Sequence, residues 1–149
     1  MLNPLAPLRR LRRDTAPLRR PKGSAGWAGR DVDELLRLAR LSFVQFQAAW
    51  DRADLQCMAD LATAPLLEEL RRQLAERGPE PNHTDVLQLE ARLLALEELR
   101  EAFVASVEFS GVIRERRDVA AAPFRELWLL ADVKAAGRGW QLAQVQSLS

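Results

Sequence analysis

The sequence of 149 residues contains few of the side chains that most metal sites and nucleophilic active sites require. It has one cysteine, Cys57, and one histidine, His83, so no disulfide can form within the chain. A zinc site takes three or four such ligands, and two residues are not enough. Cys57 lies in the apolar run LQCMADL, which favours a small buried side chain over a catalytic thiol. The sequence also lacks a Gly-rich phosphate loop and a Ser, His and Asp set, so we expect no metal, no cofactor and no enzymatic activity.

Long apolar runs are also absent. No stretch approaches the roughly 20 apolar residues that cross a bilayer. No hydrophobic segment of a signal peptide follows the first arginines. We therefore expect a chain that does not span a membrane. Apolar residues make up 48% and charged residues 29%, which is typical of one globular domain with a core of its own.

Charge is distributed unevenly along the chain. Residues 1–30 carry eight basic side chains and one acidic side chain, a net charge of +7, whereas residues 31–149 carry 14 basic and 20 acidic side chains, a net charge of −6. Four of the eight prolines lie in residues 1–30 and exclude a continuous helix there. This pattern predicts a basic arm and linker over 1–30 and a mildly acidic folded domain over 31–149. The arm residues that we expect to bind anionic lipid are Arg9, Arg10, Arg12, Arg13, Arg19, Arg20 and Lys22.

Several partners suit a cationic arm. Arginines can neutralise nucleic-acid phosphates, but Trp27 is the only aromatic residue in the arm, and an acidic domain offers no extended basic surface. A mitochondrial presequence is disfavoured because the arm is rich in proline and poor in serine. An anionic membrane surface fits best, since each basic residue near it contributes about 1 kcal/mol. The remaining alternative is a solvated tail that binds no partner.

Residues 31–50 predict an amphipathic helix of about 20 residues, with Asp31 as N-cap and Glu34 as its capping-box partner. Its apolar stripe ends in three aromatic side chains, which by themselves favour core packing. We expect a short helix over 55–61 and a third over 64–78, which begins after Thr63. In the third helix, Glu68 and Arg72 have the spacing of an ion pair.

The second half of the chain predicts strands. Residues 101–115 alternate, with phenylalanines on one face and Glu108 on the other, and residues 123–132 and 140–146 predict a hairpin. Residues 85–99 fit both a helical stripe and a strand, and their composition favours a helix. Glu108 and Glu126 are candidates for acid–base catalysis on a cone-shaped fold, but carboxylates at the rim, paired with Arg114 or Arg125, are the more common arrangement. Helices followed by antiparallel strands make an α+β domain.

Several runs occur together in one order. They are FVQFQAAWDRADL, LLEELRRQLAERG, NHTDVLQLEARLLALEE, VEFSGVIRE, PFRELWLL and RGWQLAQVQ. As a set they resemble the C-terminal lipid-binding domain of the 44-kDa subunit of the mitochondrial inner-membrane translocase, and more closely its bacterial relatives. The resemblance covers residues 31–146. It implies N-terminal helices on a curved four-stranded antiparallel sheet, related to cystatin-like and nuclear-transport-factor-two-like cones, and it implies a strand for residues 85–98.

The resemblance also implies a role. Family members form no catalytic class, and the mitochondrial domain is associated with anionic inner-membrane lipids through amphipathic segments and an apolar groove. The expected function is a non-enzymatic accessory domain, peripheral to the cytoplasmic face of the bacterial inner membrane or to the matrix side in mitochondria. It is expected to bind anionic lipid or an apolar ligand and to scaffold a membrane protein assembly. A ribosome- or RNA-associated adaptor and a small-molecule-binding enzyme are the alternatives.

Two departures from the family bear on this expectation: the chaperone-binding region has no counterpart here, and neither does the transmembrane segment that bacterial relatives often carry.

The expected apolar pocket comprises Phe43, Phe46, Trp50, Leu70, Leu74, Phe103, Phe109, Trp128 and Trp140.

Overall fold

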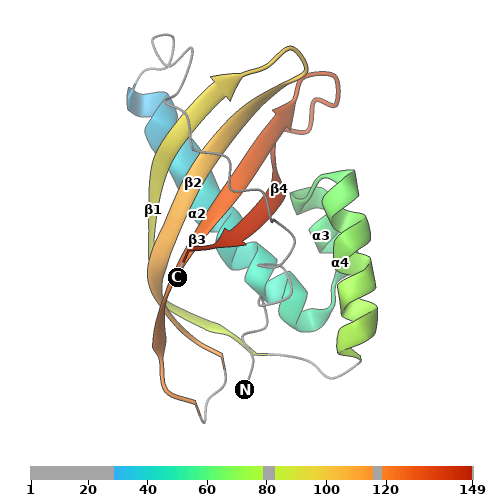
Figure 1. The fold of residues 1–149 in the computed structure, drawn as a ribbon, viewed down its shortest axis with the longest axis vertical. Coiled ribbons are helices and arrows are strands. Elements are labelled where there is room, and N and C mark those ends of the chain that lie inside the picture. The colour runs from blue at the N-terminus through green and yellow to red at the C-terminus, as the bar shows by residue number, and fades with distance from the viewer. Residues whose placement is uncertain (1–28, 79–82, 116–118, 149) are drawn as a thin grey trace.

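The computed structural model describes residues 29–78, 83–115 and 119–148. The predicted lipid-binding side chains of the basic arm lie outside these residues. Within these ranges, three helices precede four strands (Figure 1). Their bounds are α2 Gly29–Arg52, α3 Leu55–Leu61, α4 Ala64–Arg77, β1 Asp85–Glu98, β2 Ala102–Arg114, β3 Ala122–Val133 and β4 Trp140–Ser147.

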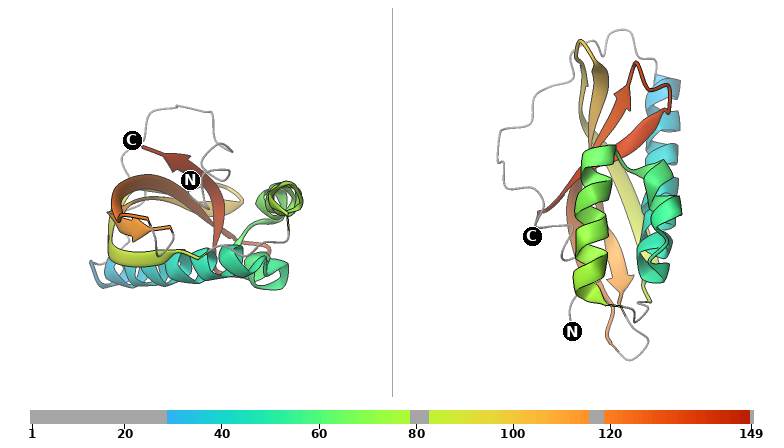
Figure 2. Two further views of the ribbon diagram at one scale, coloured as in Figure 1. Left: turned by 90° about the horizontal axis from the view of Figure 1, so that it is seen from below. Right: turned by 90° about the vertical axis from the view of Figure 1, so that its right-hand side faces the viewer.

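The four strands form one antiparallel sheet in the order β1-β2-β3-β4, which confirms the predicted α+β class. The sheet is strongly curved, with α2 along one face and with α3 and α4 beside β4 (Figure 2). We call the face toward α2 the inner face and the opposite face the outer face. This arrangement is compatible with the cone that the family resemblance implies.

Residues 85–98 form β1, so the helix that their composition favours is wrong and the strand that the resemblance implies is confirmed. β1 pairs with β2 along nearly its whole length, for example Leu89 with Gly111 and Leu93 with Val107. Leu89 and Leu93 thereby reach the core from the inner face. Pairing and burial decide the conformation of this segment, because tertiary context outweighs an intrinsic helix propensity.

The predicted helices are confirmed, with corrections at their ends. α2 begins at Gly29, so Asp31 lies in the first helical turn instead of at the N-cap, and Glu34 pairs with Arg37 instead of closing a capping box. In α3, the side chain of Asp54 accepts a hydrogen bond from the backbone N of Cys57 at 3.0 Å. That bond satisfies one of the backbone N–H groups that a helix start leaves open.

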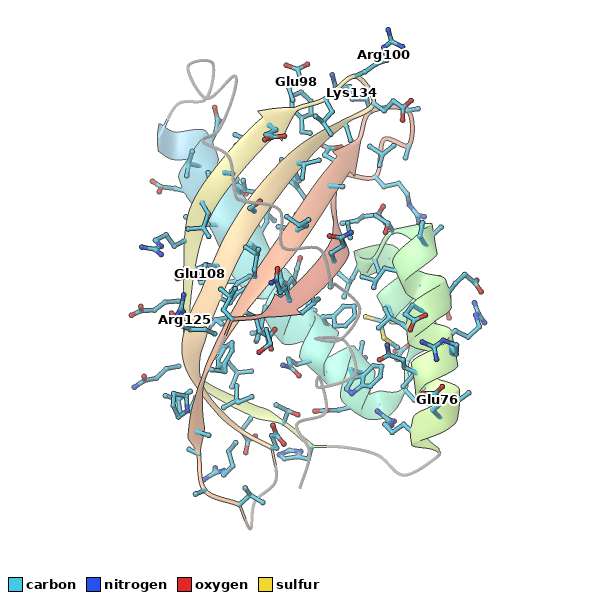
Figure 3. The ribbon with its side chains drawn as sticks, in the orientation of Figure 1. Glu76, Glu98, Arg100, Glu108, Arg125 and Lys134 are labelled. Carbon is cyan, nitrogen blue, oxygen red and sulfur yellow. The ribbon has the colours of Figure 1, made fainter. Side chains whose placement is uncertain are left out.

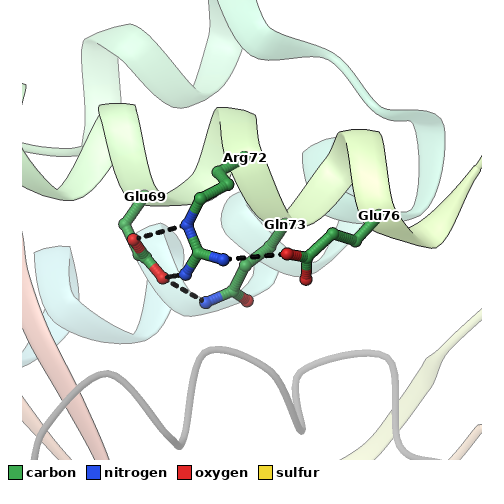
Figure 4. A network of polar contacts seen from close by, with 4 residues as sticks. All are labelled: Glu69, Arg72, Gln73 and Glu76. Carbon is green, nitrogen blue, oxygen red and sulfur yellow. Dashed lines mark hydrogen bonds and ion pairs between the residues drawn. The ribbon is translucent and has the colours of Figure 1, made fainter.

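α4 follows Thr63 as expected, and its surface carries a small ion-pair network (Figure 4). Arg72 lies between Glu69 and Glu76, one turn away on either side, and Glu69 also accepts a hydrogen bond from Gln73. The predicted pair of Glu68 with Arg72 is therefore wrong: Glu68 is 3.8 Å from Arg71. Such exposed pairs contribute a few tenths of a kcal/mol each.

The core lies between α2 and the inner face. The Phe43 ring is fully buried, and its centroid lies 4.8 Å from that of Phe109, 5.5 Å from Phe124 and 5.0 Å from Trp128. The faces predicted for residues 103–113 and 124–130 are confirmed, since these rings lie on the faces that alternation assigns to them. No helix in the described ranges has the length and apolarity needed to cross a membrane.

Candidate functional site

The residues of the predicted apolar pocket lie mostly in the core. Seven of the nine are buried and belong to one hydrophobic cluster: Phe43, Phe46, Trp50, Leu70, Leu74, Phe109 and Trp128. Several of their rings touch, as in the edge-to-face pair of Phe46 with Trp128 at 5.9 Å. Contacts between buried rings account for this set as core packing. A ligand role for it stays a prediction.

The other two residues of the predicted pocket lie at the same end of the sheet, where the β1–β2 and β3–β4 hairpins turn. Phe103 is half-buried, and the ammonium of Lys134 lies 4.8 Å from its ring centroid. Trp140 is also half-buried and lines a cavity of about 250 Å³ with Leu35 and Leu38 of α2 and Leu130 of β3. This cavity is apolar on most of its wall and is small for a lipid chain, since ligand pockets commonly measure about 300–1,000 Å³.

Glu126 is the most deeply buried carboxylate of the described chain. It lies on the inner face of β3 with 0% exposure, and its Oε1 accepts a hydrogen bond from Trp128 Nε1 at 3.0 Å. The expectation of a carboxylate at the rim is therefore wrong for Glu126. Its face could be predicted from the alternation of β3, but its depth depends on the helix that covers that face.

Glu108 has the opposite environment. It lies on the outer face of β2, where Arg92 of β1 and Arg125 of β3 each donate to one of its oxygens at 3.1 Å. Figure 3 shows Glu108 and Arg125 next to one another. The expected pairing of a rim carboxylate with Arg125 is confirmed. Arg114 instead lies 3.4 Å from Asp85. Both carboxylate oxygens of Glu108 are thus already occupied by guanidinium groups.

A groove of about 800 Å³ runs between α2 and the first half of β1, and sequence reasoning missed it. Asp51 forms part of its wall and accepts hydrogen bonds from Thr84, from the backbone N at 2.8 Å and from Oγ1 at 3.2 Å. Burial raises the pKa of Asp51, while the hydrogen bonds from Thr84 and the nearby His83 and Arg77 side chains oppose that shift. The groove arises from the packing of a helix beside an edge strand, which no local motif encodes.

Arg77 links the ends of α4 and α2. Its Nη1 donates to the backbone O of Trp50 at 2.5 Å, and its guanidinium carbon lies 5.3 Å from the centroid of the Trp50 ring. Desolvation lowers the pKa of Arg77, while Asp51 acts in the opposite direction. Three of its contacts are thus with the end of α2, which makes Arg77 a structural anchor for the helix pair.

Within the described ranges, no group of three or more His, Cys, Asp or Glu side chains has the geometry of a metal site. Comparison with known proteins adds no assignment: no family model matches the chain. No curated protein matches it either.

Proposed function

We propose that this chain is a non-enzymatic accessory domain that attaches to anionic membrane surfaces through its basic arm, residues 1–30. The observation that carries the proposal is the charge division, +7 in the arm and −6 in residues 31–149. The resemblance to the lipid-binding translocase domain supports it. The surface that we propose is the cytoplasmic face of a bacterial inner membrane, or the matrix side of the inner membrane in mitochondria.

The magnitudes favour the arm as the attachment site. At about 1 kcal/mol per basic residue near an anionic leaflet, a charge of +7 provides several kcal/mol before the cost of ordering the arm. The folded domain has a net negative charge and is repelled by the same surface. An arm-bound protein would therefore keep its domain available to other partners, such as a membrane protein assembly.

The two candidate catalytic carboxylates support a non-enzymatic function. Glu126 has no exposed surface in the described structure, whereas a general acid or base must come within hydrogen-bond reach of its substrate. Glu108 is occupied by two arginines. Neither carboxylate is placed to meet a substrate in this conformation.

Vesicle co-sedimentation of the full chain tests the proposal. We expect binding to vesicles that contain cardiolipin, little binding to neutral phosphatidylcholine vesicles, and loss of binding as salt shortens the Debye length below about 10 Å. The double variant Arg12→Gln/Arg13→Gln should lower the partition coefficient about tenfold or more, at about 1 kcal/mol per charge.

The matched control removes two arginines from the domain surface. Arg71→Gln/Arg72→Gln on α4 has the same charge change and should leave vesicle binding unchanged or only slightly weaker, because these arginines lie on the domain and not in the arm. Equal binding to neutral and anionic vesicles, or equal losses in both double variants, would overturn the proposal. Salt-sensitive co-fractionation with large ribosomal subunits, without vesicle binding, would instead favour the RNA-associated alternative.

A further inference from the structure

The edge of β1 that faces away from β2 is the free edge of the sheet. β1 is first in the strand order, and within the described ranges no strand pairs with its other edge (Figure 1). The groove at Asp51 lies beside this edge, since consecutive residues 86–89 line it. A second hollow of about 580 Å³ continues the groove along residues 89–92. A row of backbone N–H and C=O groups thus borders open space, which is the arrangement that accepts a further strand.

The middle of this edge, residues 88–93, has the regular geometry that strand pairing needs. The register of β1 with β2 shifts between Val86 and Gln88 and again between Leu93 and Ala95, and it is continuous in between. The segment contains no proline or glycine. Bulges at a sheet edge interrupt pairing, so these two shifts limit a further strand to the segment between them.

Two charged side chains of opposite sign lie on the outer face of this segment. Arg92 and Arg125 share the carboxylate of Glu108, which leaves one positive charge unbalanced. Glu90, two positions before Arg92 and therefore on the same face, lies opposite Ser110. Within the described ranges no basic side chain pairs with Glu90. The segment therefore carries one unbalanced negative charge and one unbalanced positive charge.

We propose that two copies of this chain dimerise by pairing the free edges of β1 as antiparallel strands, about a two-fold axis at Ala91. In this register Glu90 of each copy lies opposite Arg92 of the other, so both unbalanced charges gain a partner. An axis at Leu89 would place Glu90 opposite Gln88, and both ion pairs would be lost. Parallel pairing in register would place like charges directly opposite each other, which is destabilising. The order of charges along β1 thus favours a second copy in one direction and one register.

Apolar side chains along the edge favour the same contact. Leu89, Ala91 and Leu93 lie on the inner face and are half-buried against the core. In the dimer, Leu89 of one copy lies opposite Leu93 of the other. The added strand also extends the inner face past the free edge, where Val44 of α2 borders the groove and is 46% exposed. Pairing therefore removes apolar surface from water in addition to joining the charges.

Sedimentation velocity of the full chain without lipid tests the dimer. We expect a dimer at about 100 μM that dissociates on dilution, because a contact between two short edges belongs to the small interfaces. Glu90→Arg places basic residues opposite basic residues and should weaken association at least about tenfold, and Arg92→Glu should do the same with acidic residues. A native chain that is monomeric at about 100 μM, or a dimer that neither variant weakens, would overturn the proposal.

A mixture of the two single variants separates lost complementarity from misfolding. The Glu90→Arg chain has two basic residues in this segment and the Arg92→Glu chain has two acidic residues. Each alone should be monomeric, and an equimolar mixture should form a heterodimer. The double variant Glu90→Arg/Arg92→Glu restores opposite charges and should dimerise. Absence of association in both the mixture and the double variant would contradict the register at Ala91.

Glu68→Arg on α4 is the matched control, since it has the same charge change at a side chain that is 75% exposed and lies beside β4, away from β1. It should leave the dimer unchanged. An equal loss of association in Glu68→Arg and Glu90→Arg would show that net charge and not the β1 edge controls association.

Oxidative cross-linking of the full chain tests the position of the axis. With the native thiol removed by Cys57→Ala, Ala91→Cys should form a disulfide-linked dimer, because directly opposite residues of antiparallel strands have Cα atoms about 4.5–5.5 Å apart. Leu99→Cys, exposed beyond the end of β1, should link at least about tenfold more slowly, since it lies far from the axis. Equal rates at the two positions would overturn the axis at Ala91. These measurements use no lipid, so their failure leaves the proposed membrane attachment standing, and failure of vesicle binding leaves the dimer standing.

Discussion

The two faces of the sheet place the same kind of side chain in opposite environments. Glu126 and Glu108 are close in the register, where Phe109 lies opposite Glu126 and Glu108 opposite Leu127. Glu126 points to the inner face, is fully buried and bonds to Trp128. Glu108 points to the outer face, and its side chain is 13% exposed between two arginines. The two carboxylates are one position apart in the register of β2 and β3, and successive residues of a strand point to opposite faces. One therefore lies in an aromatic core and the other between two arginines.

The difference between the faces lies in what covers them. α2 brings Phe43 and Phe46 onto the inner face, so a polar group there must find a partner among core side chains. The outer face has no described helix, and its charged residues pair across neighbouring strands. Substitutions on the inner face should therefore change the free energy of unfolding through packing. Substitutions of charged residues on the outer face should change it by an amount that depends on ionic strength.

The largest effect should come from Gly111 of β2, where the backbone of β1 leaves no room for a side chain. Gly111 has a φ of +157°, and a Cβ added there would lie 1.9 Å from the backbone O of Gln88. We expect Gly111→Ala to lower the free energy of unfolding by about 4 kcal/mol or more, in the range reserved for severe backbone or packing conflicts. Urea unfolding measures this loss.

Gly137 provides the control for that substitution. It also has a positive φ, +62°, but a Cβ there would meet nothing within 4 Å. Gly137→Ala should cost about 1 kcal/mol from backbone conformation alone. Similar losses for the two variants would mean that the close contact between β1 and β2 at Gly111 adds nothing to the cost of the substitution.

The next effect should come from Phe43, whose ring touches three aromatic rings of the sheet. Phe43→Ala should lower the free energy of unfolding by about 3 kcal/mol or more, because it removes a buried ring and leaves a cavity. Leu41→Ala, two residues away on the same helix but 47% exposed, should change it by less than about 0.5 kcal/mol. Equal effects in chemical denaturation would show that α2 does not pack as described.

Sequence reasoning succeeded where one local signal decides the structure. Alternation in β2 and β3 assigns Phe109 and Trp128 to the inner face, and the limits of α3 follow from its flanking residues. It failed for β1, whose Leu, Glu and Ala content favours a helix while pairing with β2 imposes a strand. It also failed for the depth of Glu126 and for the groove at Asp51, since both depend on how a helix lies against the sheet.

A smaller effect should distinguish the two carboxylates directly. Glu108→Gln removes the charge shared by Arg92 and Arg125 and should cost about 1 kcal/mol at low salt, and less in 1 M NaCl, where the Debye length is about 3 Å. Glu126→Gln keeps an oxygen that can accept from Trp128, and any change that it causes should be insensitive to salt because the site is buried. Parallel urea titrations at two salt concentrations test this contrast. The assignment of the two faces would be contradicted if the stability change of Glu126→Gln depended on salt, or if that of Glu108→Gln did not.

The smallest effect should be a pH dependence of opposite sign at Asp51 and Asp54, three residues apart. Burial raises the pKa of Asp51, so the folded state holds that proton more tightly and the contribution of Asp51 to stability falls as pH rises through its folded-state pKa. The backbone hydrogen bond from Cys57 lowers the pKa of Asp54, so its contribution is present above the unfolded pKa and is lost as pH falls. With urea unfolding between about pH 3 and 7, the stability of the native chain relative to Asp51→Asn should decrease with pH, and its stability relative to Asp54→Asn should increase. Slopes of the same sign would mean that Asp51 is as well solvated as Asp54 and that α2 does not close over β1.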